Sequence, residues 1–138
     1  MTLPYIDTDV IICLLTGDDS VKQAAASVLF EDVEKGSLTV AAPDTVIADA
    51  VYVLASPRLY NLSRAQVTAL LTPLAQLTHF RVQNRRNVLE ALRLYGTTAG
   101  LEFGDALLVA TMQQDGSKTL YSYDHHFDRI ATIQRREP

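Results

Sequence analysis

The sequence is poor in the residues that build disulfides. Among 138 residues there is a single cysteine, Cys13, and there are three histidines and no tryptophan. One cysteine cannot form an intramolecular disulfide, so the chain must fold without that constraint. Cys13 lies in the apolar run Val-Ile-Ile-Cys-Leu-Leu, where we expect a buried thiol that packs as a small hydrophobe.

Long apolar runs are also absent. None approaches the roughly 20 residues that a membrane span needs. The first residues, Met-Thr-Leu-Pro-Tyr, do not place a basic stretch before a long apolar one, as a secretory signal would. With 48% apolar and 20% charged residues, the composition is that of an ordinary globular protein. We therefore expect one cytoplasmic domain over residues 1–138, large enough for its own core.

An excess of basic residues is missing as well, since the formal net charge is −4. Such a charge at first argues against a nucleic-acid partner. The 16 acidic residues exceed the 12 basic ones by four, and four aspartates with unusual positions account for that excess. Nine of the 12 basic residues are arginines, whose planar fork binds phosphate oxygens bidentately. The charge is therefore compatible with an RNA substrate, particularly if cations bind at the four aspartates.

Each of these four aspartates stands where an apolar segment meets a break. Asp7 closes the first apolar run, Asp49 interrupts Val-Ile-Ala-Asp-Ala-Val-Tyr-Val-Leu, Asp105 opens Gly-Asp-Ala-Leu-Leu-Val-Ala, and Asp124 follows Leu-Tyr-Ser-Tyr. A charge beside a buried segment is costly unless it is paired or bound to a metal. Several carboxylates without a cluster of Cys or His favour a site for Mg²⁺ or Mn²⁺.

Taken singly, each aspartate also has a simpler explanation. Asp7 is suited to N-cap the following helix, and Asp105 to interact with a helix dipole from the first turn. Asp124 fits a turn, and Asp49 fits the partly exposed flank of a helix. Only the four together favour a shared task.

Apolar spacing predicts short strands that alternate with helices. Strands are expected at 3–6, 38–41, 80–82 and 119–123, with a possible edge strand at 132–134. Helices are expected from about residue 10, from Ser20 to Gly36, from 44 or 45, from Ser63 with a kink or a split at Pro73, after Asn84, over 103–113 and briefly over 127–130. Alternation of this kind is typical of a parallel sheet covered on both faces. Asp7 and Asp124 both follow strands, at the carboxyl ends where such sheets bind ligands.

Four segments resemble, in order, the acidic motifs of PIN-domain nucleases: Ile-Asp-Thr-Asp-Val-Ile-Ile, Ala-Asp-Ala-Val-Tyr-Val-Leu, Phe-Gly-Asp-Ala-Leu-Leu-Val-Ala and Tyr-Ser-Tyr-Asp-His-His-Phe-Asp-Arg. Size and layout are similar to those of VapC-type toxins of toxin–antitoxin pairs. The resemblance implies a single PIN-like domain, an α/β three-layer sandwich around a mostly parallel sheet of about five short strands. It also implies Mg²⁺- or Mn²⁺-dependent endonucleolytic cleavage of RNA, a cognate antitoxin and a homodimer.

The resemblance implies that the four aspartates of these motifs form the acidic quartet of the family: Asp7, Asp49, Asp105 and Asp124. It also implies that Ser122 is a polar partner near the metal. Three positions depart from the family pattern. Asp49 stands where Glu is common and is one methylene shorter, so it is the weakest member of the quartet. Asp9 adds a charge where Asn is frequent, and Ser122 replaces a usual Thr but retains the hydroxyl.

Asp128 lies four residues after Asp124, and two roles are open to it. It either helps to hold the metal or pairs with one of the late arginines, Arg129, Arg135 or Arg136. The adjacent His125 and His126 are expected on the surface or in contact with RNA. The apolar helices around 46–54 and 67–77 offer a groove for an antitoxin helix, although core packing produces the same pattern.

Two other functions compete with the nuclease hypothesis. Asp7-Thr-Asp9 after an apolar strand also fits a haloacid-dehalogenase-like phosphatase with Asp7 as covalent nucleophile, but Asp49 and Asp105 then have no role. The other alternative is a catalytically silent PIN domain that binds RNA or a protein partner, which the short Asp49 side chain keeps open.

Overall fold

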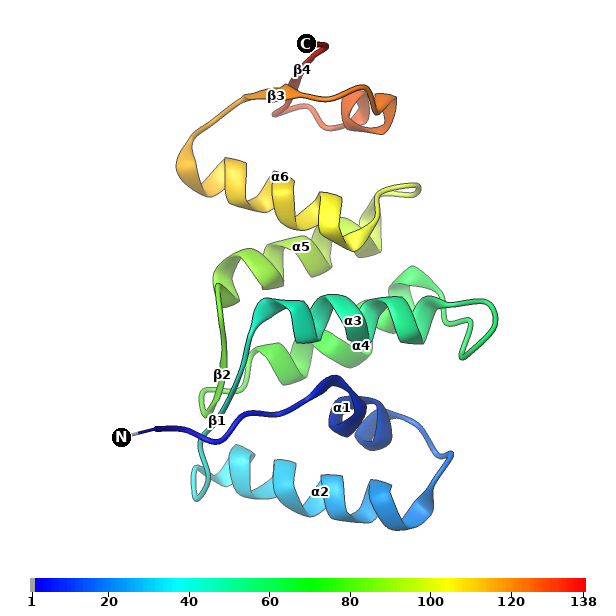
Figure 1. Cartoon of the computed structure of the whole chain (residues 1–138), viewed down its shortest axis with the longest axis vertical. Coiled ribbons are helices and arrows are strands. Elements are labelled where there is room, and N and C mark those ends of the chain that lie inside the picture. Colours follow the sequence, from blue (N-terminus) through cyan, green and yellow to red (C-terminus); the bar gives the residue numbers. More distant parts are fainter. Residues whose placement is uncertain (1) are drawn as a thin grey trace.

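A computed structural model describes residues 2–138 as an elongated stack of helices, with one strand pair at the end that carries the C-terminus and another beside the helices of the opposite half (Figure 1). The elements in chain order are α1 (Thr8–Leu15), α2 (Ser20–Lys35), β1 (Val40–Ala42), α3 (Asp44–Ala55), α4 (Arg64–Ala75), β2 (Phe80–Val82), α5 (Arg85–Thr97), α6 (Phe103–Asp115), β3 (Thr119–Tyr121), the 3₁₀ helix η1 (His125–Arg129) and β4 (Gln134–Arg136).

Local signals place most helix ends where the sequence predicts them. Gly36 ends α2 in the left-handed region with φ of 83°, a conformation that glycine adopts without strain. The cap of α2 is Asp19 rather than Ser20, because the Asp19 carboxylate accepts hydrogen bonds from two backbone N–H groups of the first turn. Ser63 begins α4 with a complete capping box to Gln66. Pro73 lies inside α4 two residues before its end, so it does not split the helix as predicted.

All strand pairs are parallel, which confirms the α/β class, but they form two separate sheets. In one, β1 pairs with β2 in the register Val40↔Phe80, and the segment before α1 adds a single bridge between Tyr5 and Ala41. In the other, β3 pairs with β4 in the register Thr119↔Gln134. The central sheet of about five strands is therefore not formed within residues 2–138.

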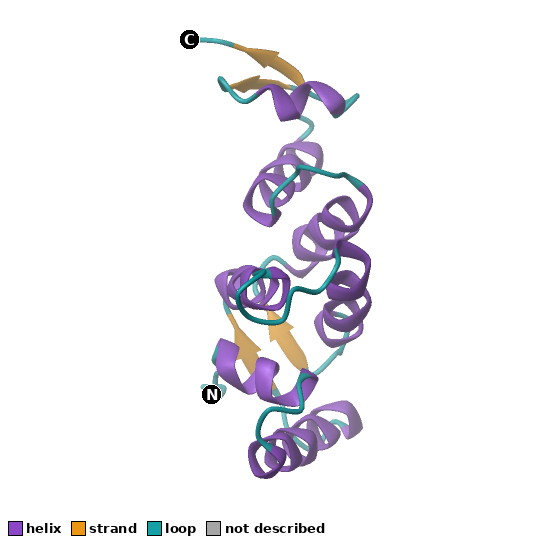
Figure 2. Ribbon diagram, turned by 90° about the vertical axis from the view of Figure 1, so that its right-hand side faces the viewer, coloured by secondary structure: helices purple, strands orange, loops and turns teal. Residues whose placement is uncertain are grey.

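The two sheets lie at a distance because helices separate them. In Figures 1 and 2, α3, α5 and α6 lie between the β1–β2 pair and the β3–β4 pair. Residues 3–6 consequently have a neighbouring strand along one edge only, which is β1. Strand β3 likewise has one neighbour, β4. The prediction of one sheet was wrong for the single chain because strand periodicity does not specify which strands pair.

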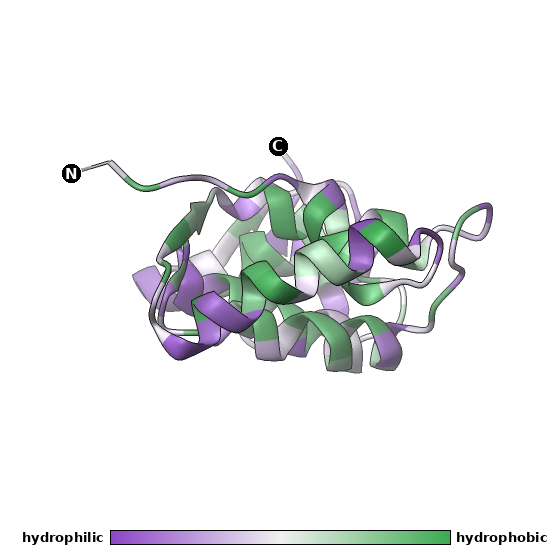
Figure 3. Cartoon of the chain, turned by 90° about the horizontal axis from the view of Figure 1, so that it is seen from below, coloured by the Kyte–Doolittle hydropathy of each residue, from purple (hydrophilic) through white to green (hydrophobic). Residues whose placement is uncertain are grey.

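A continuous apolar core runs through the stack of helices. Phe30 and Phe80 meet edge to face with ring centroids 5.7 Å apart, and Tyr95 and Phe103 do so at 6.5 Å. Apolar side chains after β3 are also buried, including Phe127 in η1. Figure 3 shows apolar residues gathered where helices pack and polar ones on outer turns and loops. In the described part of the chain, no helix combines the length and apolar character needed to cross a bilayer.

Some arginines have structural roles that composition does not reveal. The Arg64 guanidinium lies 4.4 Å from the centre of the Tyr95 ring, and its Nη1 donates to the carbonyl oxygens of Tyr95, Thr98 and Leu101. Arg85 donates to the carbonyl oxygens of Leu77 and Phe80. These two arginines join helices and turns, so they are not free phosphate ligands.

Candidate functional site

Asp7 and Asp49 line the same hollow beside α1. Asp7 is the N-cap of α1, and its Oδ1 accepts a hydrogen bond of 2.7 Å from the Thr8 N–H. Asp49 is exposed on α3, and Asp9 is exposed in the first turn of α1. The hollow is lined by Asp7, Thr8, Asp9, Ile12, Cys13, Asp49 and Val53. Cys13 is only half-buried there, so the prediction of a buried thiol was wrong.

This first pair of acids is held by contacts between two helices. The Thr8 hydroxyl donates to the Val46 carbonyl oxygen at 3.5 Å, which joins the start of α1 to α3. Helix α1 follows Asp7 directly, so the capping role and a metal-binding role fall on the same carboxylate. In the observed cap, only Oδ1 of the Asp7 carboxylate accepts a hydrogen bond. The capping role is therefore compatible with binding of a metal ion by Asp7.

Asp105 and Asp124 form a second pair, at the start of α6 and the start of η1. Asp105 is half-buried in the first turn of α6. Its burial raises the pKa of the carboxyl group, and the negative charges of Asp124 and Glu102 raise it further, while His126 lowers it. Neighbouring acids oppose the ionisation of such a carboxyl group. A bound cation would stabilise its charged form.

Hydrogen bonds fix the position of Asp124. As the N-cap of η1, its Oδ1 accepts from the His126 backbone N–H at 2.9 Å and lies 2.7 Å from His126 Nδ1. These two interactions with His126, the backbone one first, lower the pKa of Asp124. The Ser122 hydroxyl accepts a bond of 3.0 Å from the Asp124 N–H. Ser122 thus shapes the turn that carries Asp124.

The structure also indicates a role for His126 that sequence reasoning missed. Its ring contacts both Asp124 and the loop before α6, because a Cβ built on Gly100 would lie 3.0 Å from His126 Cδ2. Gly100 has a φ of +81°. In the sequence, the signal for this close approach is the glycine at position 100, at the end of the loop 96–100. His126 therefore connects η1 to the loop that leads into α6.

Asp128 is engaged in ion pairs. Its Oδ1 accepts from Arg135 Nε at 2.8 Å, and its Oδ2 lies 3.2 Å from His125 Nδ1. The hydrogen bond from Arg135 is the main reason that the pKa of Asp128 is lowered. Of the two roles open to Asp128, the structure shows the pairing with an arginine.

The four aspartates do not meet at one point in a single chain. Within residues 2–138, no three Asp, Glu, His or Cys side chains lie close enough together to hold a metal ion. Asp7 and Asp49 share the hollow beside α1, whereas Asp105 and Asp124 interact between α6 and η1. The separation has the same cause as the split sheet, because Asp7 follows the segment that bridges to β1, whereas Asp124 follows β3 in the other sheet.

The chemistry of these donors nevertheless suits a hard divalent cation. All four supply carboxylate oxygens, the ligands that Mg²⁺ and Mn²⁺ prefer. Each pair alone offers the one or two carboxylates that Mg²⁺ usually takes from a protein, with water completing its shell. The donor types therefore fit a metal, while a four-carboxylate site requires the two pairs to come together.

Parallel strand pairs with intervening helices define an α/β protein. Comparison with protein families identifies it more closely: the PIN domain profile matches residues 5–133, and the chain belongs to the PIN-domain family. A search of curated proteins finds no match. PIN domains are generally nucleases, so membership indicates a nuclease-like function and does not favour the phosphatase alternative.

Proposed function

We propose that this protein is a Mg²⁺- or Mn²⁺-dependent endoribonuclease and the toxin of a type II toxin–antitoxin pair. The observation that carries the proposal is the electrostatic pair of Asp105 and Asp124. At the start of α6, burial raises the pKa of Asp105, and the negative charges of Asp124 and Glu102 raise it further. Together with PIN-domain membership, this arrangement supports a cation site.

In this proposal, Asp7, Asp49, Asp105 and Asp124 hold the metal. When bound, a divalent cation supplies an activated water and neutralises charge at the scissile phosphate. The chain's own contribution is to keep the acids oriented and charged. His126 lowers the pKa of Asp124 and orients its carboxylate by two hydrogen bonds, and Ser122 accepts a hydrogen bond from the backbone N–H of Asp124.

RNA would bind beside basic side chains that the fold has not already used. A groove between α5 and α6 is lined by Arg86 and Arg93 and by the amides of Gln113 and Gln114. Arg93 is paired with Glu90, whereas Arg86 is exposed and has no acidic partner among the ion pairs of residues 2–138. Arginine forks and amide groups bind phosphate and sugar oxygens, which supports a nucleic-acid substrate.

An antitoxin helix would occupy the groove between α3, residues 56–64 and the start of α6, which the helix face 67–77 does not line. Its lining includes Val51, Tyr52, Leu62, Tyr95 and Phe103. Tyr52 is 74% exposed, which is unusual for a large aromatic side chain and typical of an interaction surface. An amphipathic helix places its apolar face into such a groove.

The activity proposal is tested by RNA cleavage with purified protein. We expect cleavage with Mg²⁺ or Mn²⁺ and none with EDTA. Asp7→Asn and Asp105→Asn should each abolish cleavage while the circular dichroism spectrum stays unchanged. Asp115→Asn is the matched control, since this exposed residue ends the same helix that Asp105 begins, and it should cleave like wild type.

Three other outcomes would point elsewhere. Full cleavage by both Asp7→Asn and Asp105→Asn would refute the role of the four aspartates. A phosphorylated intermediate trapped on Asp7 would establish the phosphatase alternative. Tight RNA or protein binding without any metal-dependent cleavage would establish a silent binding domain.

A further inference from the structure

The positive charge of this protein is concentrated in one short segment. Residues 81–93 carry four arginines and a single acid, a net charge of +3, whereas the other 125 residues carry 8 basic and 15 acidic residues, a net charge of −7. The four arginines are Arg81, Arg85, Arg86 and Arg93. An anionic partner is therefore attracted to this segment and repelled by most of the remaining chain.

Two adjoining hollows contain these arginines. The first lies beside the β1–β2 pair, and its lining includes Tyr5, Arg81 and Arg85. The second lies between α5 and α6, and its lining includes Arg85, Arg86, Arg93 and the amides of Gln113 and Gln114. Arg85 lines both hollows, so they form one continuous surface, which we call the basic groove.

Two arginines of the basic groove are free to bind a ligand. Arg81 and Arg86 are exposed, and neither has an acidic partner among the ion pairs found within residues 2–138. Arg93 is paired with Glu90, the one acid of the segment. Arg85 donates to two backbone carbonyl oxygens, so it adds charge to the groove while its position stays fixed.

An exposed aromatic side chain lies in the same row of the sheet as Arg81. Tyr5 bridges to Ala41, and Ala41 pairs with Arg81, so the three side chains project from one face. Two spacings between neighbouring strands place the backbones of Tyr5 and Arg81 about 10 Å apart. Between them, Ala41 contributes only a methyl group. Tyr5 is 71% exposed, so its ring is accessible beside the guanidinium of Arg81.

This combination of groups is suited to single-stranded nucleic acid. Proteins that bind single strands hold the phosphates in a positively charged groove and stack bases on aromatic rings. Arginine forks bind phosphate oxygens bidentately, and amides such as those of Gln113 and Gln114 bind phosphate and sugar oxygens. Only an unpaired base is free to stack on a protein ring. An acidic protein segment would use the arginines but would leave Tyr5 without a role.

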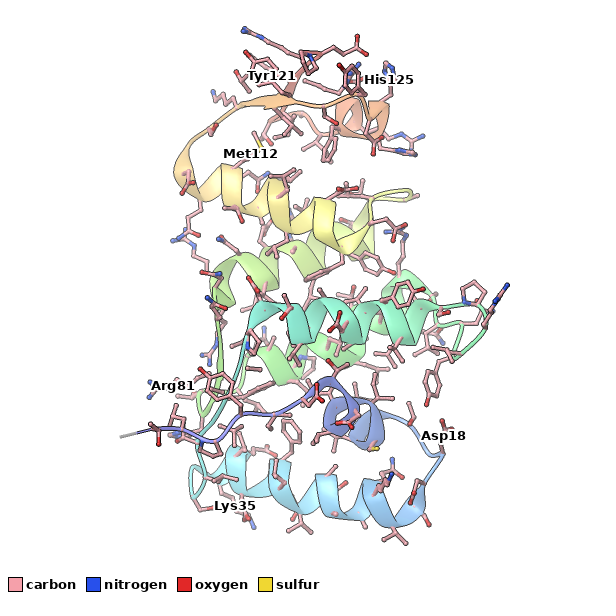
Figure 4. All side chains as sticks on the ribbon, viewed as in Figure 1. Asp18, Lys35, Arg81, Met112, Tyr121 and His125 are labelled. Atoms are coloured by element: carbon pink, nitrogen blue, oxygen red, sulfur yellow. The ribbon has the colours of Figure 1, made fainter. Side chains whose placement is uncertain are left out.

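The basic groove lies away from Asp105 and Asp124. Figure 4 shows Arg81 on the left of the molecule and His125, the neighbour of Asp124, on the right. In the same view, α5 begins and α6 ends on the left, whereas α6 begins on the right (Figure 1). Gln113 follows Asp105 by eight residues on α6, about 12 Å along the helix axis. The groove is therefore too far from these acids to hold the phosphate that is cleaved.

We propose that the basic groove binds a single-stranded part of the RNA substrate, with Arg81 and Arg86 on its phosphates and an unpaired base on Tyr5. This inference rests on the proposed nuclease function, in which the same RNA is cleaved at the aspartates. The groove is then a second contact, and it favours RNA long enough to reach from the groove to the aspartates.

Binding of a labelled RNA in EDTA tests the groove without cleavage. The probe is a fluorescein-labelled oligouridylate, followed by fluorescence anisotropy at several salt concentrations. In the variant with Arg81→Gln and Arg86→Gln, Kd should rise at least about tenfold, because two charge-assisted contacts are lost. The slope of log K against log salt should become shallower by about 1.4, since each phosphate contact with a single strand contributes about 0.7.

The variant with Arg58→Gln and Arg136→Gln is the matched control. It removes the same charge from two exposed arginines that do not line the basic groove. Its Kd and its salt dependence should stay near those of wild type. Equal losses in the two double variants would show that only net charge matters, and they would overturn the proposal.

Tyr5→Leu tests the stacked base. The Kd for the single strand should rise at least about fivefold because base–aromatic stacking is lost, while the salt dependence stays unchanged because no charge is removed. Tyr5→Phe keeps the ring and should bind like wild type. So should Tyr121→Leu, since Tyr121 is 64% exposed but lies on β3. Duplex RNA should bind Tyr5→Leu and wild type alike, and an equal loss for duplex and single strand would overturn the stacking of an unpaired base.

The outcomes separate the groove from the nuclease function. Wild type that binds RNA through Arg81, Arg86 and Tyr5 but never cleaves it with Mg²⁺ or Mn²⁺ would retain the groove and reject the nuclease. Wild type that cleaves RNA, with no change in binding in the arginine variant, would reject the groove and retain the nuclease. Polyglutamate that displaces the RNA from the groove at lower concentration than unlabelled RNA does would assign the groove to a protein partner and overturn the proposal.

Discussion

His126 illustrates how one side chain determines the state of another. It provides both the backbone and the side-chain interactions that lower the pKa of Asp124, and its ring packs against Gly100. In the sequence, His126 follows Asp124 by two residues and looks like an ordinary surface histidine. Its two interactions favour the charged form of the Asp124 carboxylate, which is the form that binds a cation.

Replacing His126 with Ala should raise the pKa of Asp124 only in part. The backbone N–H of residue 126 is the first cause of the lowered pKa and remains in the variant, while the side-chain hydrogen bond is lost. The pKa should therefore rise but stay below its ordinary value. The measurement is an NMR titration of the Asp124 carboxyl carbon. An unchanged pKa would show that the ring has no influence on this acid.

The charge of Asp105 should reduce stability when no metal is present. Its pKa is raised in the folded chain by burial and by Asp124 and Glu102, so the folded state binds its proton more tightly than the unfolded state does. Stability contributed by this group is present at low pH and falls as the pH rises through the folded pKa. In EDTA, Asp105→Asn should therefore raise the melting temperature at pH 7.

The stabilisation by Asp105→Asn should shrink as the pH is lowered, because wild-type Asp105 then becomes neutral as well. Thermal unfolding of both proteins from pH 3 to pH 8 measures this. A gain that is absent at pH 7, or equal at all pH values, would contradict the raised pKa of Asp105 in the folded chain.

At the scale of elements, the loop between α5 and α6 positions the start of α6 against η1. Arg64 holds this loop through the carbonyl oxygens of Thr98 and Leu101, and Gly100 allows His126 to approach closely. The loop therefore links α4, α6 and η1. Asp105 at the start of α6 and Asp124 at the start of η1 are positioned by these links.

Gly100→Ala should be more destabilising than Gly116→Ala. Both glycines have positive φ, 81° and 73°, so both variants carry the strain of a left-handed alanine, about 1–2 kcal/mol. Only at position 100 does the added Cβ meet a side chain, at 3.0 Å from His126 Cδ2, whereas nothing lies within 4 Å at position 116. Urea denaturation of both variants isolates the contact. Equal losses would mean that His126 moves aside freely.

At the scale of the whole molecule, the sequence predicted the local structure well and the long-range pairing poorly. Capping residues and apolar spacing located the starts of α4 and α6, since those signals act within a few residues. The division of the strands into two separate sheets has no such signal, because alternation identifies a strand and not its neighbour. Likewise, carboxylates at strand ends were recognised, but their division into two pairs depended on how the sheet is divided.

The same limit explains the arginines. Their number suggested phosphate binding, yet Arg64, Arg85 and Arg135 donate mainly within the protein. Which arginines remain free follows from tertiary contacts that composition does not encode. Exposed residues such as Arg86 are left for a substrate.

The most direct test of a metal-dependent acidic site is the binding of Mn²⁺ measured by isothermal titration calorimetry. Wild type and the Asp115→Asn control should bind Mn²⁺ alike, while Asp105→Asn and Asp124→Asn should each bind at least about tenfold more weakly because a carboxylate donor is lost. Absence of binding by wild type, or equal affinity in all four proteins, would contradict a metal site built from these aspartates.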